Sequence, residues 1–442
     1  MISHRRTTFL ILAAASVVLW TGCTSGRDAA ALGSGIDSVA ASQVGSRSSS
    51  DSQAQAGPAT GSAEVLRLQR DANAPIRGLY LNRFSVQSPA KLKKLIALAD
   101  STEINAFVID IKDEFGLNIV SSDPMLQKNA GTMTKAVNLK AWVDSMRARG
   151  ILPIARIVVF KDSVASRMNP THTIRKADGS PWRDREGLTW VNPYSNEIWE
   201  YNFRVGDEAI KMGFGEIQFD YIRFPEPYKS LPQQVFPGSN NRTKPQVLAE
   251  FLAAARARYT RSGIRTTADI FGLVTTVNGA LEVGQQWEPI AKVTDVVLPM
   301  VYPSHYPRGS FGIARPNAEP YRIIHAAISR ARERNHAIGI MGEHVRPWLQ
   351  AFSLGQPRYG AEHIRAQKQA VYDAGYDGWV LWHPGANYDI FVPALERTLV
   401  SRKKSPPVPV NRAPIPAPVS RPAVKPALAQ PEGAVSSTPP AR

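Results

Sequence analysis

The sequence contains a single cysteine, Cys23, among its 442 residues. A chain with one cysteine cannot form an internal disulfide, so its folded part must be stabilised by a hydrophobic core alone. The eight histidines follow no paired spacing, and a metal site would need His and Asp ligands in a cluster. We therefore expect neither a metal nor another cofactor.

Two features of nucleotide-binding and nucleic-acid-binding proteins are also missing. No glycine-rich, phosphate-cradling loop follows a strand-like segment. The formal net charge of +16 would suit nucleic acid, but residues 71–400 carry no basic stripe with interleaved aromatic residues. Much of the positive excess lies in residues 401–442, where seven Lys and Arg residues stand against one Glu. We expect no nucleic-acid partner; the basic segment either contacts anionic envelope polymers or lipid head groups, or is simply solvated.

The apolar run at the N-terminus, residues 9–20, is too short to span a bilayer. It follows two arginines and precedes small residues, a pattern typical of a secretory signal peptide. Thr21-Gly22-Cys23 resembles the lipobox of bacterial lipoproteins, although Trp20 stands where that motif usually has leucine. The resemblance implies an exported protein, lipidated at Cys23 and anchored in the outer membrane facing the periplasm. The alternative is a cleaved leader and a secreted protein.

Composition divides the chain into four segments. Residues 1–23 are the predicted signal peptide, and residues 24–70 have too few large apolar side chains to offset the entropy of ordering. Residues 401–442 are rich in proline and alanine, which favours extended polyproline conformations. We predict that both flanking segments are disordered and that residues 71–400 form the folded domain.

Strand-like and helix-like patterns alternate through the folded domain. Short β-branched and aromatic runs predict strands at residues 77–82, 106–112, 153–160, 216–224, 266–272, 296–302, 337–342 and 378–383. Helical periodicity predicts helices at residues 89–101, 139–149, 196–212, 246–262, 321–335 and 361–374. Eight parallel strands with crossover helices predict an α/β fold, the (β/α)₈ TIM barrel, over an open doubly wound sheet. Long connections after three strands, at 161–193, 226–245 and 303–320, would project from the face where barrel enzymes have their sites.

Charged residues interrupt several of these buried strands. In GFGEIQFDYIRFP, alternation turns Ile217 and Phe219 to one side and Asp220 to the other, inner side. A buried carboxylate costs on the order of several kcal/mol unless it is paired or used. The same alternation predicts further inward or strand-end polar and aromatic residues: Asp110, Lys112, Arg156, Asp269, Tyr302 and Trp382.

Carboxylates that converge at the open end of a barrel suit hydrolysis of a glycosidic bond. One group protonates the leaving oxygen while the other acts as nucleophile or activates water. We predict Asp220 as the nucleophile and Asp269 as the proton donor, with Asp110 as the alternative donor. Aromatic residues near strand ends and in the long connections either stack on sugars or belong to the core: Trp182, Trp190, Tyr194, Tyr302, Tyr306, Trp348 and Trp382.

Six blocks in fixed order resemble a bacterial family of proposed glycoside hydrolases, domain of unknown function 4015. They are NAFVIDIKDEFG, WVNPYSNEIWEYNFRVGDEAIKMGFGEIQFDYIRFP, TADIFG, LPMVYPSHY, RPWLQAF and GYDGWVLWHPG, within residues 77–395. The resemblance implies a TIM barrel related to larger glycosidase groups. It matches Asp220 to the usual place of the nucleophile and Asp269 to that of the acid/base, where related barrels more often have Glu. His383 and Pro384 stand where small polar residues are expected.

We therefore predict an envelope-anchored glycoside hydrolase that acts on a cell-envelope or extracellular polysaccharide by carboxylate acid/base catalysis. Arg223 would hold Asp220 ionised, and Asp110 and Lys112 would tune the pair. The predicted substrate-binding residues are Lys112, Arg156, Arg223, Tyr302, Trp348, Trp382 and His383. The alternative is a non-catalytic glycan-binding envelope lipoprotein on the same scaffold. The particular polysaccharide and the oligomeric state are left open.

Overall fold

The computed structural model describes residues 75–404. The predicted signal peptide with Cys23, the predicted linker 24–70 and residues 405–442 of the predicted tail lie outside the described residues. The first four tail residues bind the barrel domain: Ser401 Oγ donates to Asp377 Oδ2 at 2.5 Å, and Lys403 Nζ lies 2.7 Å from Glu343 Oε1. The folded domain therefore extends slightly past residue 400.

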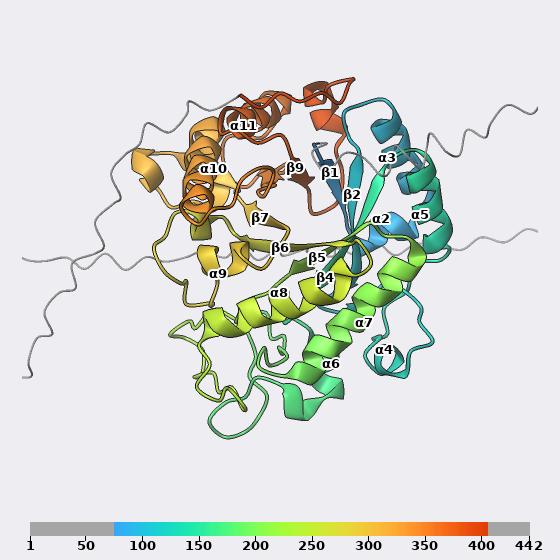
Figure 1. Ribbon diagram of the computed structural model, residues 1–442, viewed down its shortest axis with the longest axis vertical. Helices are drawn as coiled ribbons and strands as arrows, with labels where there is room; N and C mark the ends of the chain where they lie inside the picture. Colours follow the sequence, from blue (N-terminus) through green and yellow to red (C-terminus); the bar gives the residue numbers. More distant parts are fainter. Residues whose placement is uncertain (1–74, 405–442) are drawn as a thin grey trace, which may run out of the picture. The chain divides into compact units, whose positions relative to one another are not determined.

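Eight parallel strands form a closed barrel (Figure 1). They are β1 (Arg77–Leu81), β2 (Ala106–Asp113), β4 (Leu152–Val158), β5 (Glu216–Asp220), β6 (Arg265–Phe271), β7 (Val296–Met300), β8 (Trp348–Gln350) and β9 (Trp379–Trp382). Closure comes from β1, which pairs with both β2 and β9. The short β3 (Gly116–Leu117) forms an antiparallel hairpin with β2. The predicted TIM barrel is confirmed.

Six long helices, all close to their predicted positions, cover the outside of the barrel (Figure 1). They are α3 (Pro89–Asp100), α5 (Leu139–Ala148), α7 (Asn196–Met212), α8 (Lys244–Thr260), α10 (Pro320–Ala337) and α11 (Ala361–Asp373). The shorter α2 (Arg83–Gln87), α4 (Pro124–Lys128), α6 (Ser163–Met168) and α9 (Trp287–Ala291) lie in the connections. Within residues 75–404, no helix combines the length and apolarity that crossing a membrane requires.

Alternation along the strands separates two layers of side chains. Phe107 and Ile109 of β2 belong to the large apolar cluster between strands and helices, whereas Val108 belongs to a smaller cluster inside the barrel. The inner cluster is interrupted by polar side chains, among them Gln218 and Asp269, both fully buried. The barrel axis therefore carries a column of polar groups where a purely structural barrel would carry branched apolar residues.

The prediction of a strand at residues 337–342 is wrong. Ala337 is the last residue of α10, and Gly339 and Gly342 have φ of 78° and 80°, left-handed values that no strand adopts. The barrel strand is instead β8, only three residues long. The strand predicted over residues 216–224 ends earlier, at Asp220, because Tyr221 has φ of 51°.

Two of the three long connections pack against each other above the strands. Arg175 in the first and Val235 in the second form an antiparallel bridge, and Trp182 Nε1 donates to the Pro232 carbonyl at 2.8 Å. Trp182 and Trp190 are buried inside this pair of loops. These tryptophans therefore form the core of the loops and do not present their faces to a ligand.

Candidate active site

A cavity of about 270 Å³ opens where the strands end. Asp220, Phe271 and Met300 line it, and each is the last residue of its strand. Six predicted site residues line the cavity: Arg156, Asp220, Arg223, Tyr302, Trp348 and Trp382. Six residues not predicted for the site also line it: Glu114, Lys161, Glu186, Tyr221, Phe271 and Met300.

Arg156 of β4 joins the carboxylates that converge on this cavity. Its Nη1 lies 2.5 Å from Asp110 Oδ1, and its Nη2 lies 2.5 Å from Asp220 Oδ2. Its Nε lies 3.8 Å from Asp269 Oδ2. Burial alone would lower the pKa of Arg156, but Asp110 and Asp220 outweigh burial and raise it. One guanidinium therefore serves carboxylates from three strands.

Asp220 is held from two sides at the end of β5. Arg156 donates twice to its Oδ2, and the backbone N–H of Tyr221 donates to its Oδ1 at 2.5 Å. Tyr221 adopts a left-handed conformation, which costs a bulky residue about 1–3 kcal/mol. This left-handed conformation turns the chain sharply after Asp220, and the carboxylate of Asp220 lies at the wall of the cavity.

Asp269 of β6 lies one layer below the cavity. Its side chain is fully buried, and Gln218 Nε2 donates to both of its oxygens at 2.9 and 3.0 Å. Trp348 Nε1, from the cavity wall, donates to Oδ1 at 2.7 Å. Burial, and then the charge of Asp220, raises the pKa of Asp269 well above its ordinary value. The predicted role of proton donor would require contact with a substrate, and this position offers none.

Asp110 is similarly enclosed, with 3% of its surface exposed. Tyr80 of β1 donates its hydroxyl to Asp110 Oδ2 at 2.5 Å, while Arg156 binds the other oxygen. Burial, and then Asp110, raises the pKa of Tyr80 well above its ordinary value. Tyr80 was not predicted for the site, although the alternation of β1 turns it inward beside Trp382, with ring centroids 6.0 Å apart.

Lys112 does not face the barrel axis, contrary to the alternation. The pairing of β2 with β4 shifts register between Asp110 and Lys112, and this bulge turns Lys112 outward. Lys112 is fully buried, forms an ion pair with Asp162 at 2.8 Å and lies 5.2 Å from the ring centroid of Tyr201 in α7. It therefore belongs to the packing between β2 and α7.

Two other predicted residues take different partners from those expected. Arg223 lines the cavity, but its ion pair is with Glu226 at 3.0 Å, and its guanidinium packs near the rings of Trp190 and Phe271. The partner of Asp220 is Arg156, so the predicted Arg223–Asp220 pair is wrong. His383 is not among the residues that line the cavity; its Nδ1 accepts from the backbone N–H of Gly385 at 3.0 Å.

The predicted aromatic residues divide into two groups. Tyr302, Trp348 and Trp382 line the cavity, and Tyr302 and Trp382 have ring centroids 5.7 Å apart. The other four predicted aromatic residues are buried and do not line it: Trp182, Trp190, Tyr194 and Tyr306.

Glu114, the first residue after β2, is a cavity carboxylate that strand alternation could not identify, because the pattern ends with the strand. The feature of the sequence that could have identified Glu114 is its place in the block NAFVIDIKDEFG. Lys161 and Glu186, both in the first long connection, lie on the same cavity and form an ion pair at 2.9 Å. The cavity thus presents Asp220, Glu114 and Glu186 as its own carboxylates.

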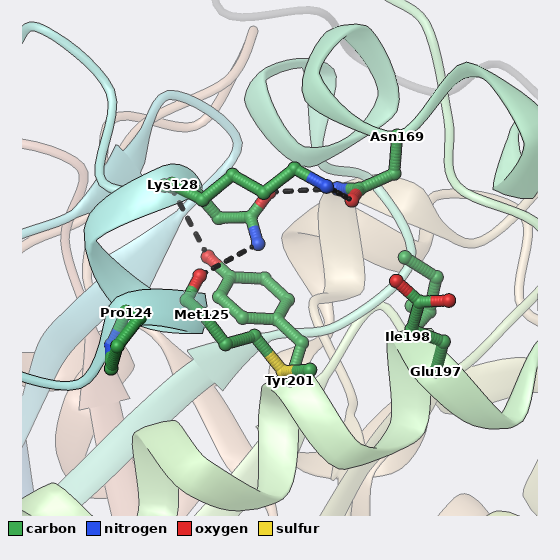
Figure 2. Close-up of a pocket in the computed structure, with 8 residues that line it drawn as sticks. Pro124, Met125, Lys128, Asn169, Glu197, Ile198 and Tyr201 are labelled. Atoms are coloured by element: carbon green, nitrogen blue, oxygen red, sulfur yellow. Dashed lines mark hydrogen bonds between the residues drawn. The ribbon is translucent and has the colours of Figure 1, made fainter.

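A second cavity, of about 290 Å³, lies between α4 and α7 and shares no lining residue with the barrel mouth. Figure 2 shows Lys128 and Asn169 directed at each other, with Lys128 Nζ donating to Asn169 Oδ1 at 2.6 Å. Asn169 in turn donates to Asn129 at 2.8 Å. Lys128, Asn129 and Asn169 therefore have hydrogen-bond partners within the wall of this cavity, whereas Glu197 contacts His172, outside the wall, at 2.7 Å. Within residues 75–404, no three His, Cys, Asp or Glu side chains converge as metal ligands would.

Residues 78–388 match the family described as "Putative glycosyl hydrolase domain", domain of unknown function 4015. This match confirms the resemblance seen in the sequence. No protein with a curated description matches the chain.

Among solved structures, the chain is similar to a hypothetical protein from Ruminiclostridium thermocellum, with 35% identity over 43% of this chain and 96% of the other, and a TM-score of 0.40. It is similar to the PgaB (BpsB) glycoside hydrolase domain from Bordetella bronchiseptica, with 17% identity over 73% and 99% of the chains, and a TM-score of 0.49. It is also similar to the spore cortex-lytic enzyme SleL from Bacillus megaterium, with 9% identity over 76% of each chain and a TM-score of 0.45.

Proposed function

This chain belongs to the glycosyl hydrolase family of domain 4015, and we propose that it hydrolyses glycosidic bonds in a cell-envelope or extracellular polysaccharide. Asp220 is the proposed nucleophile. Arg156 compensates its charge and fixes its orientation, while Asp110 and Asp269 hold Arg156 in place from below. Tyr302, Trp348 and Trp382 offer aromatic surfaces for a sugar ring at the cavity wall.

One observation carries this proposal: Asp220 is fixed by Arg156 and by its own following N–H, yet it lines an open cavity. A carboxylate that only stabilised the barrel would have no need to reach a cavity, and Asp269 does not reach it. A nucleophile needs both a fixed position and access to the substrate. Asp220 meets both requirements.

The test uses full-length wild-type protein and the Asp220→Asn variant against cell-wall glycan and exopolysaccharide preparations. The proposal expects the wild type to release reducing ends and the variant to lose at least about 10³-fold in rate. Saturable binding by both proteins without release of reducing ends would favour a glycan-binding protein and contradict the proposal. Equal release by both would remove Asp220 from the chemistry.

We further propose that Cys23 carries a lipid that holds the enzyme in the outer membrane, facing the periplasm. The support is the Thr21-Gly22-Cys23 motif behind a signal-like leader. Fractionation of cells that express wild type or Cys23→Ser tests it: the wild type should sediment with membranes and the variant should not. Membrane association that survives the substitution would contradict the anchor.

A further inference from the structure

We propose that Glu114 is the residue that protonates the glycosidic oxygen, opposite Asp220 at the reacting carbon. The inference rests on the proposed function and moves the acid from Asp269 or Asp110 to a residue at the end of β2. Glu114 lines the cavity together with Asp220. Asp110 and Asp269 are not among its lining residues.

The partners of each cavity carboxylate separate their roles. Asp220 shares two hydrogen bonds with Arg156, and Glu186 forms an ion pair with Lys161 at 2.9 Å. For Glu114, no ion pair and no hydrogen bond to its side-chain oxygens occurs within residues 75–404. Protonating Glu114 therefore breaks no ion pair, whereas protonating either of the others would break one. A general acid must carry its proton at the start of the reaction, and Glu114 is the cavity carboxylate that can do so at least cost.

The backbone that carries Glu114 is fixed although its carboxylate is free. Ser163 donates to the Glu114 carbonyl from its N–H at 3.2 Å and from its hydroxyl at 3.0 Å. Asp113 accepts from the Phe115 N–H at 2.9 Å and pairs with Arg83 at 2.6 Å. A donor must stand in a defined position to transfer a proton, and these contacts supply it.

The tight turn after Glu114 fixes the same position from the other side. Gly116 has φ of 101°, and a Cβ added there would lie 2.6 Å from the Ala130 carbonyl oxygen. Only glycine fits this close approach, so β2 must turn back into β3 directly after Glu114.

The chemistry balances with these two carboxylates alone. In the first step the Glu114 proton moves to the glycosidic oxygen, which also takes the electron pair of the breaking C1–O bond, while an Asp220 oxygen bonds to C1. In the second step a water molecule gives a proton to Glu114, and the oxygen of that water bonds to C1. The bond between C1 and Asp220 breaks at the same time. Glu114 ends protonated and Asp220 ends ionised, as both began.

The experiment compares full-length wild type, Glu114→Gln, Glu114→Ala and the control Glu333→Gln, which changes an exposed carboxylate on α10. The probes are phenyl and dinitrophenyl glycosides of the sugar that the wild type releases from polysaccharide. Glu114→Gln should lose about 10²–10⁴-fold on the phenyl glycoside, whose leaving group needs a proton, and far less in formation of the glycosyl-enzyme from the dinitrophenyl glycoside. The basic limb of the pH–rate profile should disappear as well.

Sodium azide supplies a second readout that a merely structural role would not give. With Glu114→Ala and the dinitrophenyl glycoside, azide should accelerate turnover and produce a glycosyl azide, because this anion attacks C1 without a general base. Wild type and Glu333→Gln should form none. A Glu114→Gln enzyme that cleaves the phenyl glycoside at the wild-type rate overturns this inference and leaves the proposed function intact. Absence of any hydrolysis by the wild type overturns both.

Discussion

The barrel has an ionic cluster at each end, and the two clusters are inverted in charge. At the open end, one arginine, Arg156, meets three carboxylates beside a cavity of about 270 Å³. At the other end, one carboxylate, Glu216, meets two arginines: Arg346 at 2.8 Å and Arg265 at 3.3 Å. The space there is about 20 Å³. The end of the barrel with more carboxylates than arginines is therefore the end with a cavity. The end with more arginines than carboxylates has almost no space.

The two clusters show how one fold can contain both a purely structural ion pair, at Glu216, and a group of charges that could take part in a reaction, at Arg156. Glu216 is fully enclosed, and Thr267 donates a further hydrogen bond to it at 3.3 Å. No substrate can reach Glu216, because its side chain is buried and the nearby space is so small. We infer that Glu216 stabilises the closed end of the barrel. Arg156 instead pairs with three carboxylates, of which Asp220 lines the cavity. That is where a cationic transition state of glycoside cleavage would be stabilised.

The largest effect is expected for Arg156→Gln. The substitution leaves Asp110, Asp220 and Asp269 without their shared cation, which should lower the free energy of unfolding by about 3–5 kcal/mol and abolish hydrolysis. Urea unfolding and release of reducing sugar measure the two effects. Arg156→Lys is the matched control: it keeps the positive charge but loses the planar guanidinium that binds several carboxylates at once. Compared with Arg156→Gln, it should restore stability more than activity. Full activity in Arg156→Gln would break the comparison.

Glu216→Gln should cost nearly as much stability without touching the chemistry. It leaves the buried Arg346 without its carboxylate at the closed end, with a loss of about 3–5 kcal/mol in the free energy of unfolding. The rate of hydrolysis per folded molecule should stay at the wild-type value. Activity is compared at a urea concentration and temperature where both proteins are folded. A selective loss of kcat in Glu216→Gln would show that the closed end contributes to the reaction.

A smaller effect is expected for Trp348→Phe, which removes one donor from Asp269 while keeping an aromatic ring. The lost hydrogen bond, 2.7 Å in the wild type, should cost about 1–3 kcal/mol in the free energy of unfolding. Because Trp348 also lines the cavity, KM should rise more than kcat falls. Asp269→Asn is the companion variant: it removes a charge that burial disfavours and keeps an amide oxygen that can accept from Gln218 and Trp348.

The last prediction concerns pH. Burial raises the pKa of Asp113, beside the open end, to about 7 despite its ion pair with Arg83. Between about pH 4 and 7 the folded state then binds a proton that the unfolded state has released, so the stabilising contribution of Asp113 is fully present below about pH 4 and is lost as pH rises through 7. Each pKa unit corresponds to about 1.4 kcal/mol. Urea unfolding at several pH values should give a flatter dependence for Asp113→Asn, whereas Asp144→Asn on exposed α5 should keep the wild-type slope. Identical slopes in all three proteins would contradict this assignment.

The fold was largely predictable because alternation and helical periodicity act locally. Seven strands and six helices stand near their expected positions, and the barrel follows from their order. The seventh strand failed because residues 337–342 are apolar like a strand, while the left-handed φ of Gly339 and Gly342 depends on how α10 ends. β8 is three residues long, too short to produce a pattern of its own.

The site was predictable only where the strands are regular. Alternation placed Asp110, Arg156, Asp220 and Asp269 together, and the structure brings them within one cluster. A bulge after Asp110 turns the side chain of Lys112 away from the barrel axis, and no sequence pattern marks such a bulge. Glu114 was missed because it follows the strand, where alternation no longer applies. Which cation meets which carboxylate is set by packing across the barrel, so the sequence could not choose between Arg156 and Arg223.

The most direct test of the account is mass-spectrometric trapping of the reaction intermediate on the full-length protein. A fluorosugar with an activated leaving group, built on the sugar that the wild type releases, forms the glycosyl-enzyme quickly and hydrolyses slowly. We expect one added sugar on the peptide that contains Asp220, and none in Asp220→Asn. An adduct on another residue, or unmodified protein that still turns over polysaccharide, would show that Asp220 is not the nucleophile.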